Sequence, residues 1–318
     1  MKKAVYLVGY LVVGLSLFFL LRNLVVNLKD IPGFEFTYQA VLALVISTLL
    51  CAGTVAILSL AWSLLIRGGN VYLTVRQAYV IMAQSQIGRY LPGNIWHYAG
   101  RVALGRRYGV SAEATLLSTS METVMIFGMG LIISAAGLLF SKQFFPDIKI
   151  DFYTRNLVAP IALVIAVLAV IGLAITTVFV VSKPVWTSAK NWIKKRLPYI
   201  HVGRIGVSGL LYISIFLIFG SVVWLLLNLI WQVEAGISWY QFVWSFSIAW
   251  VAGFVTPGAP GGIGVREAIL VTLYSPVLGE GLALGLSLML RVLTSLGDLV
   301  AFGLAYYLSQ TQNLKSLR

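Results

Sequence analysis

Long apolar runs separated by short polar segments fill most of the 318-residue chain. A helix needs about 20 apolar residues to cross a bilayer. Six runs meet this length: Ala4 to Leu21, Gln39 to Leu65, Thr115 to Phe140, Leu157 to Val181, Val207 to Trp231 and Gly281 to Leu308. Two more apolar stretches, Leu73 to Leu91 and Ser238 to Val255, each lead into a segment rich in glycine and proline. The pattern predicts an all-α polytopic membrane protein with about six full spans and two re-entrant helical hairpins.

The segment Gly253 to Glu267, GFVTPGAPGGIGVRE, contains five glycines and two prolines and ends in an ionic pair of neighbours, Arg266 and Glu267. Helix breakers at this density do not fit a simple crossing of the bilayer. Non-helical backbone at membrane depth is tolerated only where protein or a water-filled cavity satisfies its polar groups. We therefore expect this segment to be the tip of a re-entrant hairpin that lines a cavity.

A second copy of this motif lies upstream, from Gly88 to Val102. With a shift of 165 residues, Gly88 matches Gly253, Pro92-Gly93 matches Pro257-Gly258, and Arg101 matches Arg266. The flanking apolar runs match as well, which predicts a duplicated unit, with repeat one at 1–140 and repeat two at 157–308 of a single integral membrane domain, 1–318. Three crossings in each unit make the second unit inverted relative to the first.

Composition narrows the class of protein. The chain is 59% hydrophobic and 10% charged, with a mean hydropathy of +0.93, which excludes a soluble globular domain. Its net charge of +13 comes from basic residues in short loops, so nucleic-acid binding is not needed to explain it. The predicted inner segments hold 16 of the 23 lysines and arginines, which predicts a multi-pass protein of the cell membrane with both termini cytoplasmic. The single Cys51 allows neither a disulfide nor a cysteine metal cluster, and we expect no cofactor.

The two hairpins carry the first candidate site residues. Helix ends with exposed N–H groups attract anions, and each hairpin adds an arginine, Arg101 or Arg266, after its loop. We expect both arginines to bind an anionic headgroup, with loop N–H groups supplied by the glycines Gly93, Gly258, Gly261 and Gly262. The alternative is that each arginine extends to the nearer interface and only fixes the depth of its hairpin.

Charges inside the predicted spans supply the other candidates, because such charges are costly and are usually paired or functional. Glu122 lies in the third run, and Arg291 and Asp298 lie in the last, seven residues apart and so on one helix face. We expect Glu122 to pair with Arg291 or Arg266 in a central cavity, with Glu267 and Asp298 also at the binding site. The alternative is an ion pair that only locks the two units together.

At these motifs the chain resembles the lysylphosphatidylglycerol synthase transmembrane, flippase-like family. The resemblance rests on the proline-glycine loop ending in Arg101, the PGGIGVREA stretch from Pro260 to Ala268, and Arg291. Asn94 to Tyr98 departs from the glycines expected in the first motif. The resemblance implies an integral domain that moves lipids or lipid-linked headgroups between leaflets, built from two inverted halves with re-entrant helices. The aminoacyl-transferase chemistry of some members is not expected here.

The leading hypothesis is a lipid transporter rather than an enzyme, whose partners are membrane lipids: an anionic phospholipid or a polyprenyl-phosphate-linked headgroup. The alternative is a membrane-embedded glycosyltransferase or other lipid-modifying enzyme, although the first outer loop offers only Asp30 and Glu35 as acids. A third hypothesis is a scaffold subunit without transport. Whether the chain forms a homodimer is left open.

Overall fold

The computed structural model describes residues 33, 36–66, 73–91, 95–144, 202–233, 236–256 and 260–316. These residues form eight α-helices and no β-strand. The elements, in chain order, are α2 (Tyr38–Ile66), α3 (Val75–Gln86), the 3₁₀-helix η3 (Ile87–Tyr90), α4 (Trp96–Arg107), α5 (Ala112–Phe144), α8 (Val202–Leu225), the π-helix η5 (Leu226–Ile230), α9 (Trp239–Val255), the 3₁₀-helix η6 (Pro260–Gly262), α10 (Val265–Leu278) and α11 (Glu280–Ser316).

Four of the six predicted spans lie in the described part of the chain, and all four are long apolar helices. They are α2, α5, α8 continued by η5, and α11, each long and apolar enough to cross a membrane. The other two predicted spans, Ala4 to Leu21 and Leu157 to Val181, lie outside the described residues. The chain is therefore an all-helical, multi-pass membrane protein over the described ranges.

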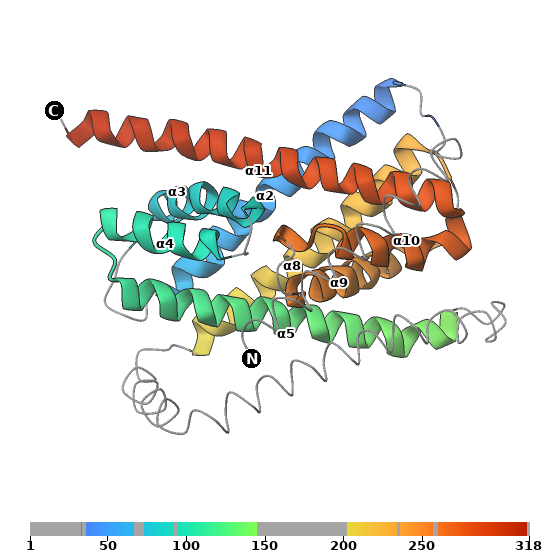
Figure 1. Cartoon of the computed structure of the whole chain (residues 1–318), viewed down its shortest axis with the longest axis horizontal. Coiled ribbons are helices and arrows are strands. Elements are labelled where there is room, and N and C mark those ends of the chain that lie inside the picture. Colours follow the sequence, from blue (N-terminus) through green and yellow to red (C-terminus); the bar gives the residue numbers. More distant parts are fainter. Residues whose placement is uncertain are drawn as a thin grey trace.

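The described helices follow the same order twice: a long helix, two short helices and another long helix. We call α2 to α5 the first unit and α8 to α11 the second unit. In each unit the two short helices form a hairpin, α3–α4 or α9–α10. Figure 1 shows the two hairpins entering the bundle from opposite ends, with their tips toward the middle. In that view the long helix α11 lies above the hairpins and α5 lies below them, and the two helices run in opposite directions.

Packing between helices repeats with this order. In the first unit α2 packs against α3 and α5, and α4 packs against the same two helices. In the second unit α8 and α10 both pack against α9 and α11. Between the units, α5 contacts α8 and α9 just as α11 contacts α2 and α3, and α2 packs against α8. Exchanging the two units therefore leaves this set of helix contacts unchanged.

Specific hydrogen bonds show which helix ends meet. The Trp62 indole near the end of α2 donates to the Ser118 hydroxyl early in α5, at 3.0 Å. Ser208, early in α8, donates to the carbonyl of Ala61 at 3.1 Å. The Arg76 guanidinium at the start of α3 donates to the Leu308 carbonyl of α11. One end of the bundle thus gathers the ends of α2 and α11 and the starts of α3, α5 and α8.

The same local signal begins both hairpins. The backbone N–H of Thr74 donates to the side-chain oxygen of Gln77 at 3.0 Å. The backbone N–H of Ser238 donates to the side-chain oxygen of Gln241 at 2.6 Å. A hydroxyl residue followed three positions later by glutamine satisfies donors that the first helical turn leaves without partners. Each hairpin therefore has a defined start close to the boundary predicted from sequence, at Leu73 and at Ser238.

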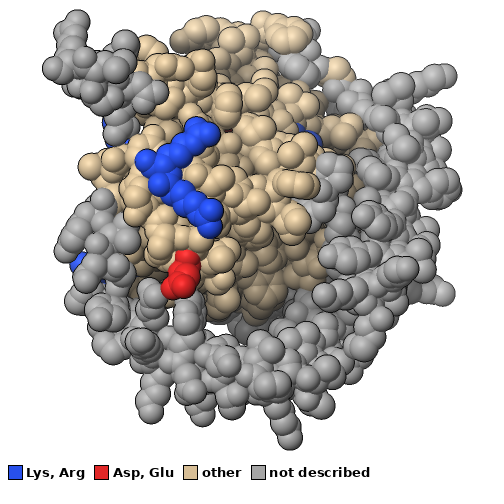
Figure 2. All heavy atoms as spheres, turned by 60° about the vertical axis from the view of Figure 1, so that its left-hand side comes forward, with Lys and Arg blue, Asp and Glu red and all other residues tan. Residues whose placement is uncertain are grey.

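The long helices bury one side in the bundle and expose apolar side chains on the other. Leu49 of α2, Leu210 of α8 and Leu304 of α11 are all more than half exposed, whereas Trp62 of α2 and Phe216 of α8 are almost fully buried. Figure 2 shows one face of the molecule, whose described surface carries few charged side chains. An exposed surface of this composition fits contact with lipid rather than with water.

The crossing of α11 and α2, which joins the two units, depends on Gly297. A Cβ at this position would lie 2.6 Å from the Cβ of Cys51 and 2.8 Å from the backbone nitrogen of Ala52. We expect Gly297→Ala to lower the free energy of unfolding by about 1–3 kcal/mol, because the backbones must separate. Thermal unfolding of the purified protein in detergent measures this.

Gly303→Ala is the matched control, because it lies on the same helix and no described atom outside its own helix backbone comes within 4 Å of its Cβ position. It removes the helix-destabilising effect of glycine without a clash and should leave stability unchanged or raise it by up to about 1 kcal/mol. Equal unfolding temperatures for the two variants would show that the crossing is not close-packed.

Candidate functional site

The tips of the two hairpins meet inside the bundle, where η3 contacts η6. A cavity of about 140 Å³ lies at this meeting point, large enough for about five water molecules. Every described α-helix contributes to its lining. The polar and charged residues that line it are Thr54, Gln86, Arg89, Tyr90, His97, Tyr98, Arg101, Glu122, Thr123, Arg266, Arg291, Thr294 and Asp298.

The cavity lies near mid-length of the long helices. Thr54 lies near the middle of α2, Glu122 is ten residues into α5, and Phe219 lies near the middle of α8. Arg291 and Asp298 likewise lie well inside α11. Charged groups at such a depth in a membrane protein face a cavity or one another, because lipid cannot solvate them.

Arg101 of α4 forms a salt bridge with Glu122 of α5, and the two side chains are only 3% and 8% exposed. The Arg101 guanidinium also lies over the Trp62 ring, 5.5 Å from its centroid. The sequence-based expectation that Glu122 pairs with Arg291 or Arg266 is wrong. Glu122 instead neutralises the arginine of its own unit, because α4 and α5 pack together and bring positions 21 residues apart into contact.

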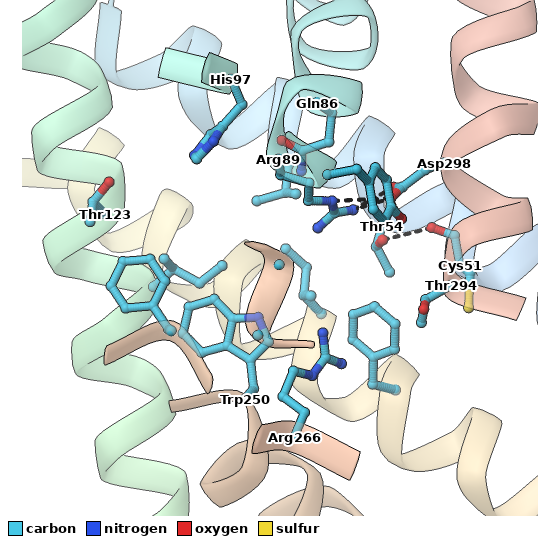
Figure 3. A pocket seen from close by; sticks show the side chains of 18 of the residues that line it. Cys51, Thr54, Gln86, Arg89, His97, Thr123, Trp250, Arg266, Thr294 and Asp298 are labelled. Carbon is cyan, nitrogen blue, oxygen red and sulfur yellow. Dashed lines mark hydrogen bonds and ion pairs between the residues drawn. The ribbon is translucent and has the colours of Figure 1, made fainter. Parts of the chain in front are cut away.

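Asp298 of α11 pairs with Arg89, a residue that the sequence analysis did not select. The Arg89 Nε donates to Asp298 Oδ2 at 3.1 Å, and the Tyr90 hydroxyl donates to the same carboxylate. This pair joins the tip of the first hairpin to the second unit (Figure 3). A signal was present, because a buried aspartate inside a span needs a cation and Arg89 lies within the first glycine-proline motif.

Glu267 and Arg291 form the third ion pair, within the second unit. Glu267 Oε1 lies 3.5 Å from Arg291 Nη1, and Glu267 Oε2 accepts the backbone N–H of Gly264 at 2.7 Å. Arg291 Nη1 also donates to the Gly261 carbonyl at 3.1 Å. The salt bridge of Glu267 therefore goes to Arg291 rather than to its sequence neighbour Arg266, and it fixes the hairpin loop to α11.

The glycines of the second motif are explained by their backbone angles. Gly261, Gly262 and Gly264 have φ values of 56°, 71° and 84°, a region that side chains with a Cβ rarely adopt. This left-handed turn sends the chain from η6 back into α10. Gly261 and Gly262 line the cavity as expected, whereas Gly93 and Gly258 lie outside the described residues.

Arg266 is different from the other three arginines of the cavity. Its side chain makes no hydrogen bond or salt bridge to any residue in the described part of the chain, and its guanidinium lies over the Phe246 ring at 5.0 Å. The aliphatic part of the Arg266 side chain passes close to two glycines. A Cβ on Gly253 would lie 2.5 Å from Arg266 Cγ, and a Cβ on Gly262 would lie 2.9 Å from Arg266 Cδ. Figure 3 shows Arg266 from one hairpin and Arg89 from the other directed toward the same space, with Trp250 beside it.

The charges of the cavity do not cancel. Four arginines, Arg89, Arg101, Arg266 and Arg291, face three carboxylates, Glu122, Glu267 and Asp298, which leaves one positive charge among the described residues. In addition, Arg101 Nε and Arg291 Nη2 are buried donors without an acceptor. Guanidinium groups without acceptors favour a carboxylate or phosphate ligand, which offers several oxygens.

His97 lies at the start of α4, outside the four candidate spans, and lines the cavity. Burial, followed by the positive charges of Arg101 and Arg89, lowers the pKa of His97 to about 3. The imidazole is therefore neutral at physiological pH and adds no charge to the site.

The helix arrangement and the charged internal cavity define a class: multi-pass helical membrane proteins with a polar chamber near mid-length of their long helices. Residues 6–301 match the family described as the lysylphosphatidylglycerol synthase TM region. The match covers most of the chain, so the chain belongs to this family, as the sequence motifs indicated. No curated protein and no solved structure matches the chain.

The Arg101–Glu122 pair gives a prediction about stability. We expect Glu122→Ala to lower the free energy of unfolding by about 3–5 kcal/mol, because it leaves a buried guanidinium without a counter-charge. The double variant Arg101→Met, Glu122→Leu should be clearly more stable than Glu122→Ala, because it buries no charge. Thermal unfolding of the variants in the same detergent tests this, and a double variant as unstable as the single one would contradict the pairing.

Proposed function

We propose that this protein moves an anionic phospholipid or polyprenyl-phosphate-linked headgroup between the two leaflets, and that it acts as a transporter rather than an enzyme. The observation that carries the proposal is Arg266, which has no acid partner among the described residues, in a cavity at mid-length of the long helices whose described charges sum to a positive value. The headgroup would occupy the cavity, while its acyl or prenyl tails stay in contact with the apolar outer surface.

The lengths of the short helices support re-entrant hairpins. At about 1.5 Å per residue, the 12 residues of α3 and of α4 extend about 18 Å, and the 17 residues of α9 about 26 Å. None of these lengths covers a hydrocarbon core of about 30 Å. In a bilayer spanned by α2, α5, α8 and α11, the hairpins would enter from opposite sides and turn back near the middle.

The cavity lining supports two inverted repeats. Five pairs of lining residues are separated by 165 residues, the same shift that aligns the two sequence motifs: Thr54 and Phe219, Arg89 and Phe254, His97 and Gly262, Arg101 and Arg266, Ile126 and Arg291. Together with the helix contacts that repeat between the units, this favours a duplicated unit whose copies face each other across the cavity. Many secondary transporters place their binding sites at such an interface.

The distribution of charge supports an orientation in the cell membrane. The end of the bundle that gathers the starts of α3 and α8 and the end of α4 carries Arg76, Arg106, Arg107 and Arg204. Cytoplasmic loops are enriched in arginine and lysine. We propose that this end, where α11 also ends, faces the cytoplasm.

Arg266→Ala tests the proposal. Loss of a charge-assisted hydrogen bond costs about 1.5–3 kcal/mol, so we expect translocation of fluorescent phosphatidylglycerol to fall about tenfold to hundredfold. Arg266→Lys keeps the charge but loses the bidentate hydrogen-bonding geometry of the guanidinium, so we expect an intermediate translocation rate. The assay measures how fast a membrane-impermeant reductant quenches the labelled lipid in reconstituted vesicles.

Arg106→Ala, at an exposed arginine near the end of α4, is the matched control and should leave the rate unchanged. Protein-free vesicles give the background. Equal rates for the wild-type protein and Arg266→Ala, both above background, would exclude Arg266 as the headgroup contact.

A further inference from the structure

The two units match in the order and contacts of their helices but not in charge, and one of the differences lies close to the repeated arginine. The shift of 165 residues that aligns Arg101 with Arg266 aligns Glu122 with Ser287. In the first unit this position holds the acid that neutralises Arg101. In the second unit it holds a hydroxyl residue, and Arg266 has no acid partner in the described structure.

The register of this comparison is supported in space. A Cβ on Gly88 would lie 2.7 Å from the backbone nitrogen of His97, and a Cβ on Gly253 would lie 3.3 Å from the Cα of Gly262. Gly253 lies 165 residues after Gly88, and Gly262 lies 165 residues after His97. Each hairpin therefore has a close approach at matching positions, and the arginines follow these positions at the same distance along the chain.

Ser287 lies where a charge would reach the cations of the second unit. It is 2% exposed, and its hydroxyl lies 3.4 Å from the Glu267 carbonyl, so it faces the start of α10, where Arg266 is found. It also precedes Arg291 by four residues, so the two side chains share one face of α11. A carboxylate at this position would lie beside the backbone of Glu267, the residue after Arg266, and about one helical turn from Arg291.

We propose that Ser287 is the residue that determines anion binding in this cavity, because its lack of charge leaves Arg266 free for the ligand. This rests on the proposed function. Glu122 occupies the place of an anion beside Arg101, so only the second unit accepts one from outside. Since one positive charge is left over among the described residues, the ligand contributes one anionic group, a carboxylate or phosphodiester, held by the Arg266 fork.

Ser287→Glu and Ser287→Gln separate charge from bulk, because the two side chains have nearly the same size. We expect Ser287→Glu to reduce phosphatidylglycerol translocation at least about tenfold, as Arg266→Ala does, because an internal ion pair replaces the ligand. Ser287→Gln should retain more than half of the wild-type rate. Equal losses in the two variants overturn the proposal, and so does a wild-type rate for Ser287→Glu.

The shorter pair Ser287→Asp and Ser287→Asn replaces them if the longer side chains prevent folding at this buried position. The same contrast is expected, and equal effects again overturn the proposal. Combining Ser287→Glu with Arg266→Ala gives a second measurement. If both changes remove the same cation, the double variant translocates lipid no more slowly than the slower single variant. A loss of rate equal to the product of the two single losses contradicts a shared mechanism.

Ligand binding distinguishes this inference from the proposed function. Short-chain phosphatidylglycerol should raise the unfolding temperature of the wild-type protein and of Ser287→Gln, but not that of Ser287→Glu. If the wild-type protein binds this lipid but does not translocate it, the transport function fails while the role of Ser287 stands. If all three proteins are stabilised equally, the role of Ser287 fails even where transport is observed.

Discussion

The cost of holding guanidinium groups inside an apolar bundle constrains this structure more than any other single factor. A buried arginine without a counter-charge is strongly destabilising, and three of the four cavity arginines have a carboxylate partner from a neighbouring helix. Each of these ion pairs also joins two elements: α4 to α5, η3 to α11, and α10 to α11. The same interactions therefore neutralise the interior and fix both hairpins.

Close backbone packing makes these pairs geometrically available. Short helices bring the hairpin tips to mid-length of the long helices, and glycines allow the approach: Gly253 and Gly262 accommodate the stem of Arg266, and Gly297 allows α11 to cross α2. A side chain at any of these positions would push apart the elements that carry the charges. The polar chamber is thus a product of tight apolar packing around it.

A nearly symmetrical backbone carries an unsymmetrical set of charges. The arginine is repeated in both units, but its acid partner is present only in the first, where Glu122 matches Ser287. The repeated helix contacts place one hairpin tip from each unit at this central chamber. Among the described residues, the departure from symmetry leaves that chamber with an excess positive charge and leaves Arg266 without an acid partner.

The sequence by itself determined the class of fold, because apolar length, glycine-proline motifs and the family motif are local properties. The four described spans and the two hairpin helices lie where their patterns predicted, and Gly261, Gly262, Arg101 and Arg266 reach one cavity. Only the tertiary structure decided which charges pair. Glu122 and Arg101 are brought together by the packing of α4 on α5, and Arg89 meets Asp298 across more than 200 residues of chain. Such distant pairings depend on helix rotation and register, which no local pattern encodes.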